Sequence, residues 1–280
     1  MTMNNEALFK IYNALREPCE ALEAFRGMHL FFFLAMGLVT YLLVRFFRNC
    51  SFATFKVILF CFWLTVFILE ILRQFFYCVR YDPATESFIY KMQLYSLPLQ
   101  LCAMQHYMLP AILLLPRGKA SDAAMLFMAT YSLIGGLAVM LNPATISTTL
   151  AFINVQGLVH HGIQCIAGVF IIAHEHAYFE KKSFLHNFLL FLSIVGVVLI
   201  LNEHAYELAE KLDVSPWNLF FLSPHTTSNI KIIQQLREVM THTQFVIGYI
   251  LTLTLASLLL YVILAFVFRK TDKRYISNWR

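Results

Sequence analysis

Seven stretches of this chain are long and apolar enough to cross a lipid bilayer as helices, since one crossing needs roughly 20 mostly apolar residues. They cover residues 29–47, 52–77, 92–115, 122–141, 148–173, 184–208 and 243–268. Lipid offers the backbone no hydrogen-bond partner, so stretches of this length must be helical. Only 13% of the residues are charged, against about 25% in an average soluble domain. The sequence therefore predicts an all-α, polytopic transmembrane helical bundle of about seven spans.

The two ends of the chain differ from the spans between them. Residues 1–28 are polar and amphipathic and lack the basic start and short apolar core of a signal peptide, so we expect an N-terminal interfacial helix. Residues 29–268 should form one seven-helix transmembrane domain, because no repeat or linker divides them. Residues 269–280 form a basic C-terminal tail. The distribution of Lys and Arg among the loops favours a multi-pass protein of the cell membrane with its N-terminus outside and its C-terminus inside.

Polar side chains occur inside several predicted spans, where they are costly and mark either a site or a buried structural contact. One face of the fifth span carries Asn154, Gln156, His160, His161 and Gln164. In the third span, Cys102 and His106 lie one helical turn apart. The sixth span ends in polar residues 202–204, and the seventh begins near His242. We expect the third, fifth, sixth and seventh spans to surround a polar pocket, with the first span at the periphery.

Three other features of the sequence bear on the fold and on the site. Glu70 and Arg73 in the second span are three residues apart and predict a structural ion pair. Pro98 and Pro110 should kink the third span or leave backbone carbonyls free. Asn218 lies in the long loop 209–242, and loops of that length are often functional.

The third span also carries a motif that resembles a known family. Residues 97–102 read Leu-Pro-Leu-Gln-Leu-Cys and resemble the LPLxLC signature of the bacterial YwaF-like integral membrane proteins. Other positions similar to that family are Gly135, Gly136, Asn142, Pro143, the histidine of residues 159–162, and Asn218. The likeness runs from about residue 52 to residue 268.

That family is in turn distantly similar to the eukaryotic transmembrane protein 164, an acyltransferase that places polyunsaturated acyl chains on ether phospholipids. Pro98 and His106 match its P-C-H-x5-H stretch, His161 matches a Q-H, and residues 240–242 match an M-T-H. The cysteine after the proline corresponds here to Leu99. Cys102 lies one turn further on and, in a helix, shares a face with Leu99 and His106, so we expect it to take over the role of nucleophile.

The leading hypothesis is therefore a phospholipid acyltransferase that works inside the membrane with a Cys/His site. A cysteine reacts as its thiolate, so a histidine must accept the proton, and His161 is favoured over His106 because it approaches from a facing helix. The expected catalytic residues are Cys102, His106, His161 and His242. The expected substrate-binding residues are Asn154, His160, Gln164 and Asn218.

Two other functions fit the same pattern. A membrane transporter or lipid-binding protein could use the polar face of the fifth span as a substrate path, although no inverted repeat supports a transporter. A metal enzyme could hold zinc on His106, His161 and His242, but no local ligand motif supports it, and we expect these imidazoles not to converge. We expect no cofactor, membrane phospholipids as partners and no nucleic-acid binding; no protein partner can be inferred.

Overall fold

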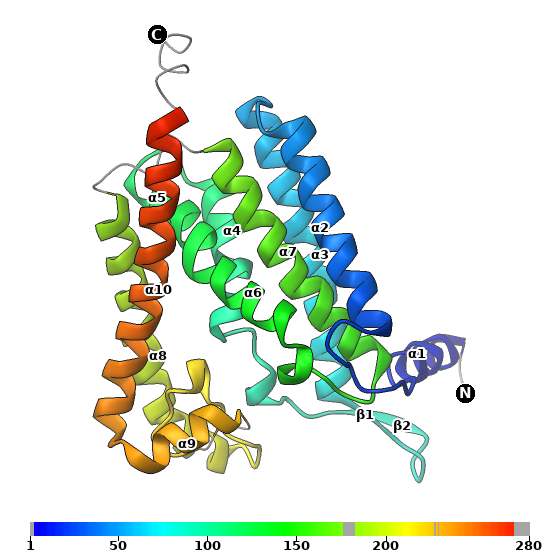
Figure 1. The fold of residues 1–280 in the computed structure, drawn as a ribbon. Coiled ribbons are helices and arrows are strands. Elements are labelled where there is room, and N and C mark those ends of the chain that lie inside the picture. Colours follow the sequence, from blue (N-terminus) through cyan, green and yellow to red (C-terminus); the bar gives the residue numbers. More distant parts are fainter. Residues whose placement is uncertain (1–2, 176–182, 227, 229, 272–280) are drawn as a thin grey trace.

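The computed structural model describes residues 3–175, 183–226, 228 and 230–271, and these form a helical bundle (Figure 1). Six helices in this part of the chain are long and apolar enough to cross a membrane. They are α2 (Gly27–Phe47), α3 (Phe52–Cys78), the combined helix Lys119–Leu141, α7 (Ala151–His174), α8 (Ser183–Lys211) and α10 (His242–Thr271). The predicted all-α transmembrane bundle is confirmed. Of the predicted basic tail, residues 272–280 lie outside the described residues.

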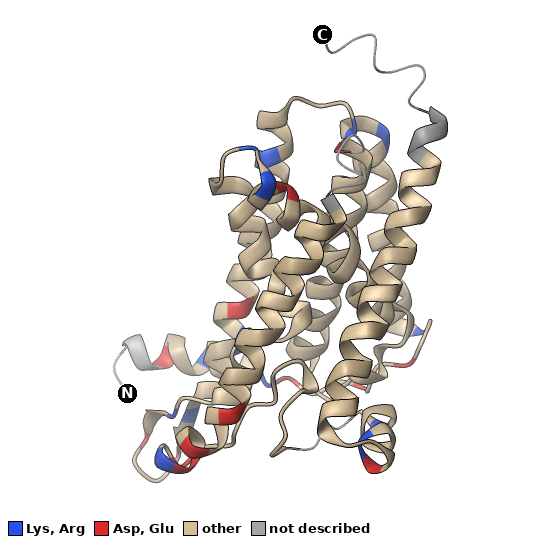
Figure 2. Ribbon diagram, turned by 90° about the vertical axis from the view of Figure 1, so that its left-hand side faces the viewer, with Lys and Arg blue, Asp and Glu red and all other residues tan. Residues whose placement is uncertain are grey.

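Charged residues lie mainly toward the two ends of the bundle, and its middle is largely uncharged (Figure 2). Such a distribution is what a bilayer demands, because a charge at mid-membrane is costly unless it is paired. The long helices also expose large apolar side chains, including Phe31 and Leu34 of α2 and Leu255 and Leu259 of α10. These surfaces suit contact with lipid tails.

The third predicted span is not a continuous helix, which corrects the expectation for residues 92–115. It consists of the 3-10 turns η1 (Leu94–Ser96) and η2 (Leu101–Met104) followed by α4 (Gln105–Leu114). Pro98 explains the break, because its ring disfavours helical backbone at the preceding residue. Leu97 is accordingly extended, with φ −58° and ψ 141°. An antiparallel hairpin, β1 (Val79–Asp82) and β2 (Ser87–Tyr90), joins α3 to this irregular stretch.

Side chains of α3 provide hydrogen bonds that α4 lacks. Pro110 has no N–H, so the carbonyl of His106 loses its partner one turn later. Trp63 Nε1 donates to this carbonyl at 3.3 Å. Near the end of α4, Lys56 Nζ donates to the carbonyl of Leu113 at 2.7 Å. The short helix is therefore held against α3 by polar contacts as well as by packing.

The fourth span contains a π-helical turn between two α-helices: α5 (Lys119–Phe127), η3 (Met128–Ser132) and α6 (Leu133–Leu141). A π turn is rare and persists where other groups stabilise it. Here Asn187 of α8 donates to Thr130 Oγ1 at 3.1 Å, and Gln164 of α7 donates to Ser132 Oγ at 2.9 Å. The distorted turn thus ties two other helices to this span.

Helix α7 is the central element of the bundle, and most of its residues are buried. It packs against α2, α3, α6 and the π turn. Small residues permit close approaches: a Cβ at Gly136 would lie 3.2 Å from the carbonyl oxygen of His161, and one at Gly168 would lie 2.9 Å from that of Met128. The backbone of α7 therefore touches the fourth span directly.

The N-terminal segment is attached to the end of the bundle that carries the β-hairpin (Figure 1). It begins with α1 (Met3–Ala14). Arg16 then donates from Nη2 to the carbonyls of Phe76 and Val79, at 2.7 and 2.9 Å, at the C-terminal end of α3. A cation suits the free carbonyls of a helix end. The interfacial position of residues 1–28 stays a prediction.

The loop after α8 is fixed to that helix before α10 begins. It contains the 3-10 turn η6 (Leu219–Phe221) and the helix α9 (Lys231–Val239). The Asn202 side chain donates to the carbonyl of Leu219 and accepts from its N–H, both at 2.9 Å. Trp217 Nε1 also donates to the carbonyl of Leu201 at 3.1 Å.

The close approach at Gly168 generates a stability prediction. Gly168→Ala should lower the free energy of unfolding by about 1–3 kcal/mol, because the new methyl group meets backbone that cannot move away freely. Gly162→Ala on the same helix is the control, since a Cβ there has nothing within 4 Å. Alanine also favours the helix by about 1 kcal/mol over glycine. Thermal unfolding in detergent should rank Gly162→Ala at or above the unmodified protein, and equal stability of the two variants would contradict the packing argument.

Candidate active site

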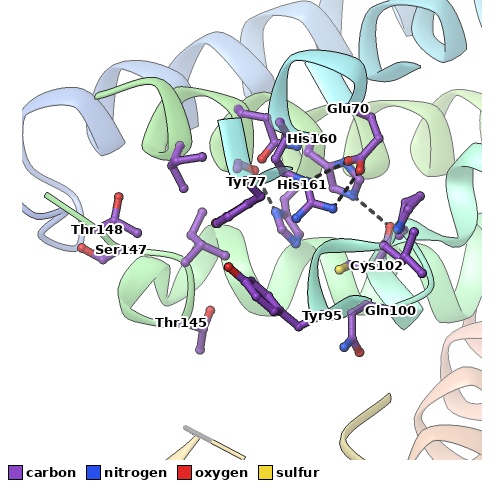
Figure 3. A pocket seen from close by; sticks show the side chains of 18 residues that line it. Glu70, Tyr77, Tyr95, Gln100, Cys102, Thr145, Ser147, Thr148, His160 and His161 are labelled. Carbon is purple, nitrogen blue, oxygen red and sulfur yellow. Dashed lines mark hydrogen bonds and ion pairs between the residues drawn. The ribbon is translucent and has the colours of Figure 1, made fainter. Parts of the chain in front are cut away.

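A cavity of about 310 Å³ lies where the third stretch departs from helical geometry (Figure 3). Its walls come from α3, from residues 95–103, from the loop 145–148 and from α7. The hydroxyl groups of the loop lie to one side, and Cys102, His160 and His161 lie together on the other. The spans that line this pocket therefore differ from the predicted ones. The second, third and fifth predicted spans line it, in place of the third, fifth, sixth and seventh.

Cys102, His160 and His161 form the chemical centre of the cavity. The cysteine sulfur and one nitrogen of each imidazole all lie within 4.8 Å of one another. The two rings are neighbours, with centroids 5.1 Å apart and planes at 64°. Both histidines are only 5% exposed. The structure thus places His160, as well as His161, beside Cys102.

Backbone carbonyls determine the protonation pattern of the two rings. His161 Nδ1 lies 2.7 Å from the carbonyl oxygen of Gly157, and His160 Nε2 lies 3.0 Å from that of Cys102. A carbonyl only accepts hydrogen bonds, so each of these nitrogens carries the proton. The lone pair of the neutral ring is then on Nε2 of His161 and on Nδ1 of His160. The latter atom is buried and has no hydrogen-bond partner among the described residues.

An ion pair closes another part of the wall. Arg73 donates from Nε and Nη2 to the two carboxylate oxygens of Glu70, at 2.9 and 2.8 Å, which confirms the pair expected from the sequence. Arg73 and Gln74 also donate to the carbonyl of Ser96 in the broken stretch. A buried charge needs such a partner, and here the two charges cancel. The wall is polar but carries no net charge from this pair.

Gln100 links the cavity wall to the loop after α8, a role that sequence reasoning missed. Its Nε2 donates to the carbonyl of Asn218 and its Oε1 accepts from the N–H of Phe220, both at 2.8 Å. Gln100 was recognisable as a polar residue in an apolar stretch. Its partners, more than 100 positions away, were not.

Two of the predicted catalytic histidines, His106 and His242, are not members of the group formed by Cys102, His160 and His161. His106 lies behind His160, with ring centroids 5.4 Å apart, and its Nε2 is 4.0 Å from Glu70 Oε2. His242, at the start of α10, has the side chains of Arg237, Glu203 and His225 as its titratable neighbours. Among the described residues, the group close enough to share an ion is Cys102 with His160 and His161. The set His106, His161 and His242 is therefore not the one brought together.

Of the four predicted substrate-binding residues, only His160 lines the cavity. Asn154 bonds with the backbone and hydroxyl of Thr148. Gln164 donates to Ser132 in the π turn. Asn218 donates to the carbonyl of Thr226 and accepts from the N–H of Ser223. The side chains of Asn154, Gln164 and Asn218 thus make structural hydrogen bonds, and a role in substrate binding stays a prediction for all four residues.

A family model matches residues 24–268, from just before α2 to near the end of α10. It is the model of the TMEM164 family. This chain belongs to the TMEM164 family. The narrower likeness to the bacterial YwaF-like proteins is not shown by this match. No curated protein and no solved structure matches the chain.

Membership in the TMEM164 family draws attention to position 99, which the resemblance aligns with a cysteine. The expectation that Leu99, Cys102 and His106 share one helical face is wrong, because Gln100 is extended, with φ −76° and ψ 160°. Leu99 packs against the hydrophobic core, whereas Cys102 lines the cavity. Cys102 is therefore the cysteine of this TMEM164-family chain that faces the two histidines.

The two hydrogen bonds that link Gln100 to the loop after α8 can be tested without any substrate. Gln100→Ala leaves the N–H of the fully buried Phe220 without its acceptor, and an unsatisfied buried group costs about 1–3 kcal/mol. Peptides covering residues 218–221 should then exchange amide hydrogen roughly 10-fold faster or more. Ser193→Ala is the control, because that exposed hydroxyl bonds only within α8. An unchanged rate of amide exchange in the Gln100→Ala protein would show that the loop does not depend on these two hydrogen bonds.

Proposed function

We propose that this protein is an acyltransferase that moves an acyl chain between phospholipids inside the membrane, with Cys102 as the nucleophile. The observation that carries the proposal is the position of the Cys102 sulfur within 4.8 Å of two buried imidazoles in a membrane-domain cavity. A thiol beside a histidine that offers a lone pair is the usual arrangement of nucleophile and base. Membership in the TMEM164 family supports the same chemistry through the resemblance described above.

The reaction would proceed in two balanced steps. His161 Nε2 accepts the thiol proton while sulfur attacks the ester carbonyl of a donor phospholipid. The carbon–oxygen bond breaks, and the leaving alkoxide oxygen takes the proton from His161 and becomes a hydroxyl. The lysophospholipid departs, and the acyl chain stays on Cys102 as a thioester. The hydroxyl of an acceptor lysophospholipid then attacks the thioester and gives its proton to His161. The carbon–sulfur bond breaks, and the proton returns to the sulfur.

The size of the cavity suits the polar part of a lipid. Its volume of about 310 Å³ is at the lower end of the range for small-molecule pockets, roughly 300–1,000 Å³. The glycerol ester region fits such a space, and the acyl chains would extend between helices into the bilayer. Thr145, Ser147 and Thr148 make the loop side of the cavity polar, and their hydroxyl groups also bond within the protein. In this proposal His160 contacts the substrate, and His106 orients His160 from behind.

A lipid-binding or transport function is the second candidate. One observation favours it, since the third stretch is a broken helix that lines a polar cavity, and transporters build their sites from such segments. The two candidates differ in whether a covalent intermediate forms. As to location, we propose the cell membrane with the N-terminus outside and the C-terminus inside.

The covalent step predicts a thioester. Detergent-solubilised protein incubated with labelled phospholipid should acquire label that hydroxylamine removes, and Cys102→Ser should abolish it because a hydroxyl is a much weaker nucleophile. Cys165→Ser is the matched control, since Cys165 is a buried cysteine of the same bundle that lies outside the cluster. Full transfer by the Cys102→Ser protein would rule out the covalent mechanism. Lipid binding without turnover in the unmodified protein would favour the second candidate.

The role of the base can be measured separately. His161→Ala should lower the transfer rate by about 10²–10⁴-fold, the usual contribution of general acid–base catalysis. Its effect on phospholipid binding should be much smaller. His174→Ala serves as the comparison, because His174 bonds to the carbonyl of Cys50 at the far end of α7. Equal rates for both variants would exclude His161 as the base and point to His160.

A further inference from the structure

The cluster has more ligand atoms than acyl transfer requires. One histidine is enough to accept the proton of a cysteine, yet a nitrogen from each of two rings lies within 4.8 Å of the Cys102 sulfur. We propose that Cys102, His160 and His161 form a binding site for one zinc-class divalent metal ion. A thiolate and two imidazoles are ligands that such an ion prefers, and three protein ligands leave a fourth position open toward the cavity.

The distances suit an ion with only small side-chain movements. Bonds of about 2.3 Å to sulfur and about 2.1 Å to nitrogen place two ligands of a tetrahedral ion roughly 3.5 Å apart. The three atoms already lie within 4.8 Å of one another. Small side-chain rotations that move the ligand atoms by about 1 Å would therefore complete the site. All three residues are on helical elements, since Cys102 is in the 3-10 turn η2 and both histidines are in α7.

The surroundings of the rings support ligation independently of these distances. Metal-bound histidines usually donate their other N–H to a backbone carbonyl or a carboxylate, which fixes the tautomer. His161 donates to Gly157 and His160 to Cys102 in this way. The remaining nitrogen of His160 is buried without a hydrogen-bond partner in the described part of the chain. An unpartnered buried lone pair costs free energy, and coordination of the metal ion through Nδ1 of His160 would satisfy it.

The charges near the site also permit a cation. Arg73 would repel it if it were unpaired, but Glu70 neutralises that charge in a bidentate pair. On binding, the thiol loses its proton to water and the sulfur–metal bond replaces the S–H bond, so the bound ion adds a net single positive charge. The ion holds the sulfur lone pair, so metal binding and thioester formation exclude each other. This last consequence rests on the proposed function, whereas the site itself does not.

Cobalt gives a direct optical test, because Co²⁺ takes zinc sites and absorbs visibly when bound. The full chain, purified in detergent with a chelator and then dialysed free of it, would be titrated with Co²⁺ alone. We expect one equivalent to produce a thiolate-to-cobalt charge-transfer band and the visible bands of a tetrahedral ion, and Zn²⁺ to remove both. Cys102→Ala should lose the charge-transfer band, and His161→Ala should weaken cobalt binding at least 10-fold. The Cys165→Ala variant, which removes a different cysteine of the same bundle, should behave like the unmodified protein.

Two results would overturn the inference: no charge-transfer band in the unmodified protein with Co²⁺ in excess, or an undiminished band in the Cys102→Ala protein. Cys102→Ser provides a second test if the alanine variant folds poorly, since it keeps the side-chain shape without the sulfur. The labelled-lipid assay distinguishes this inference from the proposed function. A thioester without a cobalt band would contradict the metal site alone. A cobalt band, with neither thioester nor turnover in the metal-free protein, would contradict acyl transfer alone.

Discussion

Every backbone polar group inside a bilayer must find its hydrogen-bond partner within the protein, and the cavity of this chain exists because one segment meets that requirement without being a helix. Pro98 interrupts the third stretch, and the carbonyl of Ser96 then takes hydrogen bonds from Arg73 and Gln74. Gln100 in turn binds the backbone of the loop after α8. Non-helical backbone is tolerated at this depth only where it faces protein or a polar cavity, and here it faces both.

The ion pair of Glu70 and Arg73 serves the fold and the cavity together. Its arginine holds the broken segment in place, while its carboxylate lies within 4.0 Å of His106 and keeps the net charge of this wall near zero. Uncharged imidazoles have a lone pair to offer, which both proton transfer and metal binding require.

Helix α7 provides the other fixed side of the site. Its close contacts with the fourth span, through Gly136 and Gly168, leave its backbone little freedom to shift. The carbonyl of Gly157 orients His161, and the carbonyl of Cys102 orients His160 from the facing segment. The positions of the reactive atoms are thus set by main-chain groups of packed elements. Such support is what keeps a reactive geometry within a few tenths of an ångström.

The sequence by itself determined the helical transmembrane class, because hydropathy and span length depend on composition within one segment. It also singled out Cys102, His160 and His161 as polar residues in apolar stretches, and it predicted the Glu70–Arg73 pair, since residues three apart meet on a helix. What it could not determine is which polar residues converge. Periodicity gives the direction of a side chain only if the helix is continuous. The third predicted span is not continuous, because Pro98 interrupts it. The grouping of Cys102 with two adjacent histidines, and the separate placement of His242, depend on how helices far apart in sequence pack, so only the tertiary structure decided them.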